Sequence, residues 1–202
     1  MTRHDWLVRQ GRWRWPDVAR LLVAALVPLV WVVYGAPAAA AMFLALGGAM
    51  AARFLDLPRR HDLACQVVLA LSAWWAADGS YDRVRWLDLV AHAGSGAALA
   101  LLVLRLLPQA PTRGAPLAAG ERRRRVATTT LSVLALGVVW ELGELAGHLW
   151  LDPAIHVTFA DSLSDLVADG AGALVAAPVA TRVSPAASGR SAAASAGSPR
   201  RS

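Results

Sequence analysis

Long apolar runs separated by short polar segments are the dominant pattern of this chain of 202 residues. Each run is about as long as an α-helix must be to cross the roughly 30 Å hydrocarbon core of a bilayer. We therefore predict an all-α fold, a polytopic transmembrane bundle of about six spans. The predicted spans cover residues 18–34, 36–53, 62–77, 86–107, 126–150 and 161–181.

Two of these spans have a second interpretation. Residues 62–77 are near the short limit for crossing a bilayer, so this segment is either a tilted span or a partly re-entrant helix. The charged start of the chain, the apolar run at 18–34 and the small residues after it imitate a cleavable signal peptide. Because the chain stays apolar where a mature protein normally becomes polar, an uncleaved first span is the favoured interpretation.

The polar remainder of the chain lies outside the predicted spans. Residues 1–17 are rich in Arg and Trp and form a predicted N-terminal segment, and the linker at 108–125 is rich in Pro, Gly and Arg. Residues 182–202 are a Ser, Ala and Arg tail that cannot bury a core and is predicted to be disordered. Residues 18–181 are thus predicted to form one membrane domain.

The arginines predict the orientation of that domain. All 20 basic residues are Arg, and only Arg83 and Arg85 lie on the side opposite to the N-terminal segment, the loops after the second and fourth spans, and the tail. Because basic flanks resist translocation, we predict a multi-pass protein of the cell (plasma or inner) membrane with both termini in the cytoplasm. The arginines form short runs between apolar segments and no single face, so the net charge of +6 indicates the lipid bilayer as partner and excludes nucleic acid.

Composition supports the membrane class and narrows the chemistry. Hydrophobic residues make up 56% of the chain and charged residues 17%, which is outside the usual range of soluble domains. The single cysteine, Cys65, excludes an intrachain disulfide framework and a multi-cysteine metal site.

We expect ionisable residues inside the membrane only in the last three predicted spans. Each such residue costs several kcal/mol of free energy unless it faces protein or water. They recur at spacings of three and four, which places them on one face of each helix. The residues are Asp88 and His92 in the fourth span, Glu141, Glu144 and His148 in the fifth, and Asp161, Asp165 and Asp169 in the sixth.

Antiparallel threading of the three spans would bring these side chains to one level. At about 1.5 Å per residue, the deeper members lie about 6 to 14 Å below the outer boundary of the membrane. We therefore predict one outward-facing pocket. It is expected to hold His92, Glu141, Glu144, Asp165 and Asp169, with Asp88, His148 and Asp161 at its mouth.

Simpler roles explain some of these residues. Asp88 and Asp161 begin helices, where a carboxylate interacts favourably with the helix dipole, and Asp161 suits the N-cap position. The deeper acids are not explained in this way, and their set indicates a functional site. Small residues are expected to let the three helices approach closely, namely Gly94, Gly96, Gly143, Gly147, Gly170 and Gly172.

Several carboxylates in a layer of low dielectric repel one another, so either some are protonated or a cation neutralises them. Ion pairs with arginines are not expected to neutralise these carboxylates, because only Arg83 and Arg85 could reach the mouth of the pocket. A mixed carboxylate and imidazole shell suits Mn, Fe or Zn, whereas carboxylates alone suit Mg or Ca. The expected cofactor is a divalent metal cation of open identity, with Asp88, His92, Asp165 and Asp169 as ligands.

The order DxxxH, ExxE and DxxxDxxxDxxG over residues 82–178 resembles the VanZ-like proteins and the related YjdF-like group of small bacterial inner-membrane proteins. The matching residues are Asp88 and His92, Glu141 and Glu144, and Asp165, Asp169 and Gly172. VanZ-like members usually carry Asn at the position of Asp169 and tend to carry Gln at that of Glu144, so the YjdF-like group is the better match. The resemblance implies a bacterial membrane protein whose biochemical role is unresolved.

Three functions fit this pattern, and whether the chain is an enzyme stays open. One is a metal-dependent membrane enzyme acting on a lipid-linked or envelope substrate at the outer leaflet, with Glu141 or Glu144 as general base. The others are a cation- or proton-coupled transporter and a structural or accessory protein whose acids bind the bundle together. The inner halves of the last three spans carry little that is polar beyond Thr128 to Thr130 and Ser132, which favours a one-sided site over transport. Motifs of soluble enzymes, such as a phosphate loop or a dinucleotide fingerprint, are absent.

Overall fold

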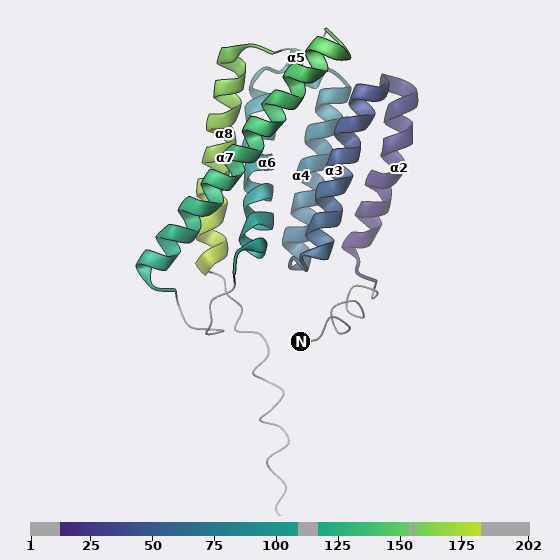
Figure 1. Cartoon of the computed structure of the whole chain (residues 1–202). Helices are drawn as coiled ribbons and strands as arrows, with labels where there is room; N and C mark the ends of the chain where they lie inside the picture. The colour runs from purple at the N-terminus through teal and green to yellow at the C-terminus, as the bar shows by residue number, and fades with distance from the viewer. Residues whose placement is uncertain (1–12, 109–116, 154, 156, 183–202) are drawn as a thin grey trace, which may run out of the picture.

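All regular elements in the described part of the chain are helices. The computed structural model describes residues 13–108, 117–153, 155 and 157–182. Residues 1–12 of the predicted N-terminal segment, 109–116 of the predicted linker and 183–202 of the predicted tail lie outside the described residues. Within these residues lie six long helices and one short one, arranged as in Figure 1: α2 (Pro16–Tyr34), α3 (Ala36–Phe54), α4 (Arg59–Ala77), α5 (Ser80–Arg83), α6 (Trp86–Leu106), α7 (Ala119–Trp150) and α8 (Phe159–Arg182).

The six predicted spans correspond to the six long helices, with one large difference in length. α7 begins at Ala119, well before the predicted start at residue 126. The additional turns contain residues 121–125, whose glutamate and arginines are good helix formers in water. An ion pair of 3.2 Å between Glu121 Oε1 and Arg125 Nε, at i and i+4, stabilises this extension.

The helices form a polytopic membrane bundle. Five of them, α2, α3, α6, α7 and α8, are long and apolar enough to cross a bilayer. α4 has 19 residues, as α2 and α3 do, and packs between α3 and α6, but its first turns carry charged residues. Large apolar side chains face outward, such as Val32 at 85% exposed and Val175 at 70%. Such side chains suit contact with lipid acyl chains.

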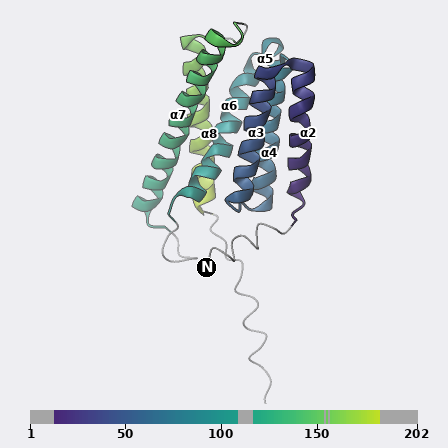
Figure 2. The same ribbon diagram turned by 45° about the vertical axis from the view of Figure 1, so that its right-hand side comes forward.

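The chain threads up and down through the bundle. α2, α4 and α7 run in one direction and α3, α6 and α8 in the other, as Figure 1 shows. We call the end that contains Tyr34, Trp86 and Trp150 the upper end, and the end that contains Pro16 and Ala119 the lower end. Figure 2 shows α2, α3 and α4 on one side and α7 and α8 on the other, and α6 joins the two groups through its contact with α4. The starts of α6 and α8 and the end of α7 therefore meet at the upper end.

Glycines allow α6 and α8 to pack in backbone contact. A Cβ atom at Gly96 would lie 2.2 Å from the carbonyl oxygen of Asp169, and one at Gly172 would lie 1.9 Å from that of Ala93. No larger residue fits at either position without moving a helix. The predicted role of these two glycines is confirmed, and their contact sets how α8 presents its acids to α6.

The expectation for the other glycines is met unevenly. Gly170 packs closely against Leu134 of α7, but Gly143 faces open space, so the prediction for Gly143 is wrong. A glycine that the prediction did not include, Gly137 of α7, allows the carboxylate of Asp169 to approach, since a Cβ there would lie 2.8 Å from Asp169 Oδ2. Spacing along the chain does not reveal which face of α7 turns inward.

A second group of buried charges lies at the lower ends of α2, α3 and α4. Arg20 Nη2 lies 2.5 Å from Asp62 Oδ1, and Asp17 forms ion pairs with both Arg20 and Arg53. Arg20 also donates through Nε to the carbonyl of Ala49 at 3.0 Å. The prediction that ionisable residues within the spans occur only in the last three is therefore wrong. Because Arg20 and Asp62 lie close to the helix ends, the sequence pattern did not separate them from the solvated flanks.

Candidate metal centre

His92 lies at the centre of the predicted site and has a carboxylate on each side of its ring. Its Nε2 atom is 3.8 Å from Asp88 Oδ1, one helical turn earlier on α6, and 3.8 Å from Asp165 Oδ2 on α8. Its Nδ1 atom is 3.5 Å from Asp169 Oδ1. The close packing of α6 on α8 thus brings together four of the six predicted site residues.

Three of these side chains converge in a way that suits one metal ion. Ligand atoms of Asp88, His92 and Asp165 all lie within 4.8 Å of one another. An ion with bonds of about 2.0–2.2 Å keeps its ligand atoms about 3–4 Å apart. Small side-chain rotations would therefore bring these three ligand atoms to bonding distance of one ion.

The carboxylates of α8 are buried and incompletely paired. The exposed fraction is 3% for Asp165 and 5% for Asp169, whereas Asp88 and His92 are half-buried. Asp165 Oδ1 has no hydrogen-bond partner among the described residues. A buried carboxylate oxygen without a partner is costly, so this atom indicates a position where a cation or a proton belongs.

α7 adds two further acids at the same level. Glu141 is half-buried, and its Oε1 atom is buried without a hydrogen-bond partner in the described part of the chain. Glu144 accepts a hydrogen bond from Trp140 and interacts electrostatically with Glu141, His92 and Asp165. Both predicted base candidates thus lie near the residues of α6 and α8. We call the whole group the acid cluster; its members are Asp88, His92, Glu141, Glu144, Asp165 and Asp169.

No arginine neutralises this cluster within the described residues. Arg83, which the sequence analysis placed within reach of the mouth, instead pairs with Asp78 at 3.3 Å and donates to Ser80 Oγ at 2.9 Å. Hydrogen bonds from Ser80 and the charge of Arg83 hold the pKa of Asp78 below its ordinary value. Asp78 and Arg83 therefore form a local pair, and the acids near His92 have no arginine partner among the described residues.

Tyr81 lies within electrostatic range of this site, which the sequence pattern did not predict. It lies on the short helix α5, and its hydroxyl donates to the carbonyl of Ser72 on α4 at 2.8 Å. Burial and the negative charges of Asp88, Glu144 and Asp165 raise the pKa of Tyr81. The only sequence signal was a tyrosine just before a span, which is also typical of an ordinary interfacial residue.

Two residues predicted at the mouth have other contacts. The backbone N–H of Asp161 donates to Thr158 Oγ1 at 3.2 Å, so Thr158 caps α8 and the prediction of Asp161 as the N-cap is wrong. Asp161 still interacts electrostatically with Asp88 and Asp165. His148 Nδ1 lies 2.7 Å from the carbonyl oxygen of Ile155 and holds the loop between α7 and α8.

Comparison with known proteins agrees with the membrane fold. The family model described as a predicted membrane protein (DUF2238) matches residues 18–185, which is most of the chain. The chain therefore belongs to this family of predicted membrane proteins. No curated protein and no solved structure matches it.

Proposed function

We propose that this member of a predicted membrane protein family binds a divalent cation at the upper end of its bundle and uses it to act on, or bind, a lipid-linked or envelope substrate. The observation that carries the proposal is the convergence of Asp88, His92 and Asp165 within 4.8 Å, where no arginine of the described residues balances the acids. A cation would lower the repulsion among these carboxylates and satisfy the buried Asp165 oxygen.

The two edges of the His92 ring suggest different roles for the acids. Nε2 faces Asp88 and Asp165, so these three side chains are the proposed ligands. Nδ1 faces Asp169, which matches the common arrangement in which a ligating histidine donates its other N–H to a carboxylate. We therefore assign Asp169 to orienting His92, in place of the direct ligand role expected from the sequence. A mixed oxygen and nitrogen shell favours Mn, Fe or Zn.

The glutamates of α7 are the proposed proton acceptors. Glu144 is held by its hydrogen bond from Trp140 and interacts with His92 and Asp165, and Glu141 has an unpartnered buried oxygen. A carboxylate beside a cation can take a proton from a water or hydroxyl group that the cation has polarised. This chemistry would serve hydrolysis or transfer at a polar group of a substrate that lies in the membrane.

The cellular placement belongs to the same proposal. The arginine-rich lower end favours the cytoplasmic side of a bacterial cell membrane, which would put the cluster near the outer leaflet. The resemblance of the DxxxH, ExxE and DxxxDxxxDxxG pattern to the YjdF-like and VanZ-like proteins supports this placement. Substrates within reach of the cluster would then be lipid-linked or envelope molecules.

Transport of a cation or proton is the second candidate, and one observation favours it. Thr129 and Thr130 of α7 have buried hydroxyl oxygens without hydrogen-bond partners among the described residues. They place polar groups on α7 between the cluster and the lower end. A cation flux into proteoliposomes would favour this candidate, whereas a site open only to the upper end predicts none.

The metal content of purified protein tests the main proposal. We expect about one divalent ion per wild-type chain, none for Asp165→Asn, and affinity about 10–100-fold lower for Asp169→Asn, because the latter changes only an orienting residue. Asp82→Asn is the matched control, since Asp82 is an exposed acid at the same end of the bundle. Equal and negligible metal in the wild type and all three variants would overturn the cation proposal.

A further inference from the structure

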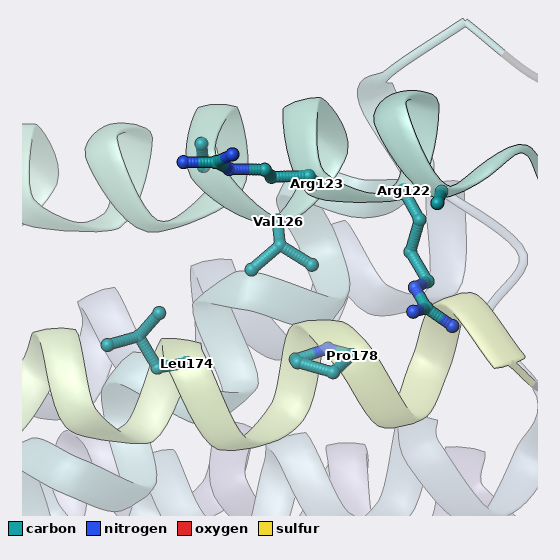
Figure 3. Close-up of a pocket in the computed structure, with 7 residues that line it drawn as sticks. Arg122, Arg123, Val126, Leu174 and Pro178 are labelled. Carbon is teal, nitrogen blue, oxygen red and sulfur yellow. The ribbon is translucent and has the colours of Figure 1, made fainter.

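An open groove lies at the lower end of the bundle, away from the acid cluster. It runs between the first turns of α7 and the last turns of α8 and has a volume of about 510 Å³. Figure 3 shows Val126 of α7 facing Leu174 and Pro178 of α8 across this space, with the Arg122 guanidinium extended towards α8. Arg123 and Ala127 also line the groove.

The groove is divided into a charged part and an apolar part. Arg122 and Arg123 are exposed and precede the apolar stretch of α7, and neither has an ion-pair partner within the described residues. By contrast, the neighbouring Arg125 donates hydrogen bonds to Glu121 and to the carbonyl of Pro108. The apolar walls continue from the arginines into the membrane-spanning part of both helices, where Leu174 is 54% exposed.

We propose that this groove binds an anionic phospholipid of the surrounding bilayer. Its phosphate would lie against Arg122, whose guanidinium extends towards α8, Arg123 would add attraction from its place along α7, and an acyl chain would lie along Val126, Leu174 and Pro178. Charge complementarity carries the choice of occupant, because the groove opens at the arginine-rich end of the protein and basic pockets between membrane helices suit anionic headgroups. The division between charged and apolar lining also matches the two parts of a phospholipid.

The binding of phosphatidylglycerol to the delipidated full chain in detergent, measured by native mass spectrometry, tests this proposal. An arginine near an anionic lipid surface contributes roughly fivefold in affinity, so we expect on the order of a 25-fold loss for the double variant Arg122→Gln and Arg123→Gln. Ala127→Phe keeps both charges but fills the groove, and it should lower affinity as well. Phosphatidylcholine should bind far more weakly than phosphatidylglycerol to the wild type.

A second pair of arginines provides the matched control. Arg59 and Arg60 are also adjacent, exposed and at the start of a helix at the lower end, but they do not line the groove. Their double glutamine variant should bind phosphatidylglycerol like the wild type. Equal losses in the two double variants would overturn the proposal, because they would show general attraction to positive charge.

Two further outcomes would also overturn it. Competition by glycerol 3-phosphate as strong as that by phosphatidylglycerol would show a site for free phosphate in place of a lipid. Dimers that are lost in the Ala127→Phe variant, with lipid binding unchanged, would assign the groove to a second copy of the chain. Metal content should be the same in all of these variants, which separates this test from that of the upper-end cluster.

Discussion

Individual buried charges are balanced in two different ways in this molecule. At the lower end, Asp62 is fully buried and lies 2.5 Å from Arg20, so acid and base offset each other. At the upper end, Asp165 is buried beside other acids, and its ion-pair partner among the described residues is His92. The lower group therefore has the character of a structural contact, and the upper group that of a site that needs a cation or protons.

Neutralising Asp62 should destabilise the bundle strongly. Asp62→Asn keeps the size of the side chain but leaves Arg20 with less compensating charge in a buried position, and we expect a loss of about 3 kcal/mol in the free energy of unfolding. Denaturant or thermal unfolding in detergent would measure it. Asp56→Asn is the control, because Asp56 forms an exposed pair with Arg14 and should change stability by less than about 1 kcal/mol. Similar stability of the two variants would show that the buried pair contributes no more to the free energy of unfolding than the exposed pair.

Which side chains lie close together was predictable from the sequence where their spacing along a helix was regular. Asp88 and His92, four apart on one helix, do lie close together, and the stripe of α8 brings Asp165 to the same ring. The roles of Arg20 and Tyr81 were not predictable, because each lies near a helix end, where charged and aromatic residues are common at any membrane interface. Only tertiary contacts distinguish a buried partner from such a flank.

At the scale of elements, the helices themselves follow from the sequence, but their mutual rotation does not. The apolar runs end at polar segments, so their lengths predict the bounds of α2, α3 and α6 to within a few residues. The contact of α6 with α8 depends on Gly96 and Gly172, and nothing along the chain shows that these glycines face each other while Gly143 faces open space. That rotation decides which acids meet His92.

The glycine contacts of α6 and α8 can be tested with single methyl groups. Gly96→Ala or Gly172→Ala should push the helices apart and lower the free energy of unfolding by about 1–3 kcal/mol. Metal affinity should fall with it, because Asp165 and Asp169 move away from His92. Gly143→Ala, in open space, should be neutral or stabilise the helix by up to about 1 kcal/mol. Thermal unfolding of the three variants measures the difference, and equal effects at all three positions would contradict the close packing of α6 on α8.

At the scale of the whole molecule, two kinds of polar contact lie in different groups of helices. The buried ion pairs lie within α2, α3 and α4, and the acid cluster lies within α6, α7 and α8. Tyr81 connects them at the upper end, since it donates to α4 while it interacts with acids of the other three helices. A shift of α4 would therefore move the Tyr81 hydroxyl relative to these acids.

The proposed substrate class depends on which side of the membrane the upper end faces, and cysteine labelling in intact cells can determine this. Cys65 is buried, with 1% of its surface exposed, so the native chain should give little background with an impermeant maleimide. Pro153→Cys, in the exposed loop after α7, should react from outside the cell. Asp56→Cys, in the loop between α3 and α4 at the arginine-rich end, should react only after permeabilisation, because basic flanks are retained in the cytoplasm. The reverse pattern would place the acid cluster towards the cytoplasm, and an envelope substrate would then be out of its reach even if the cation site itself were correct.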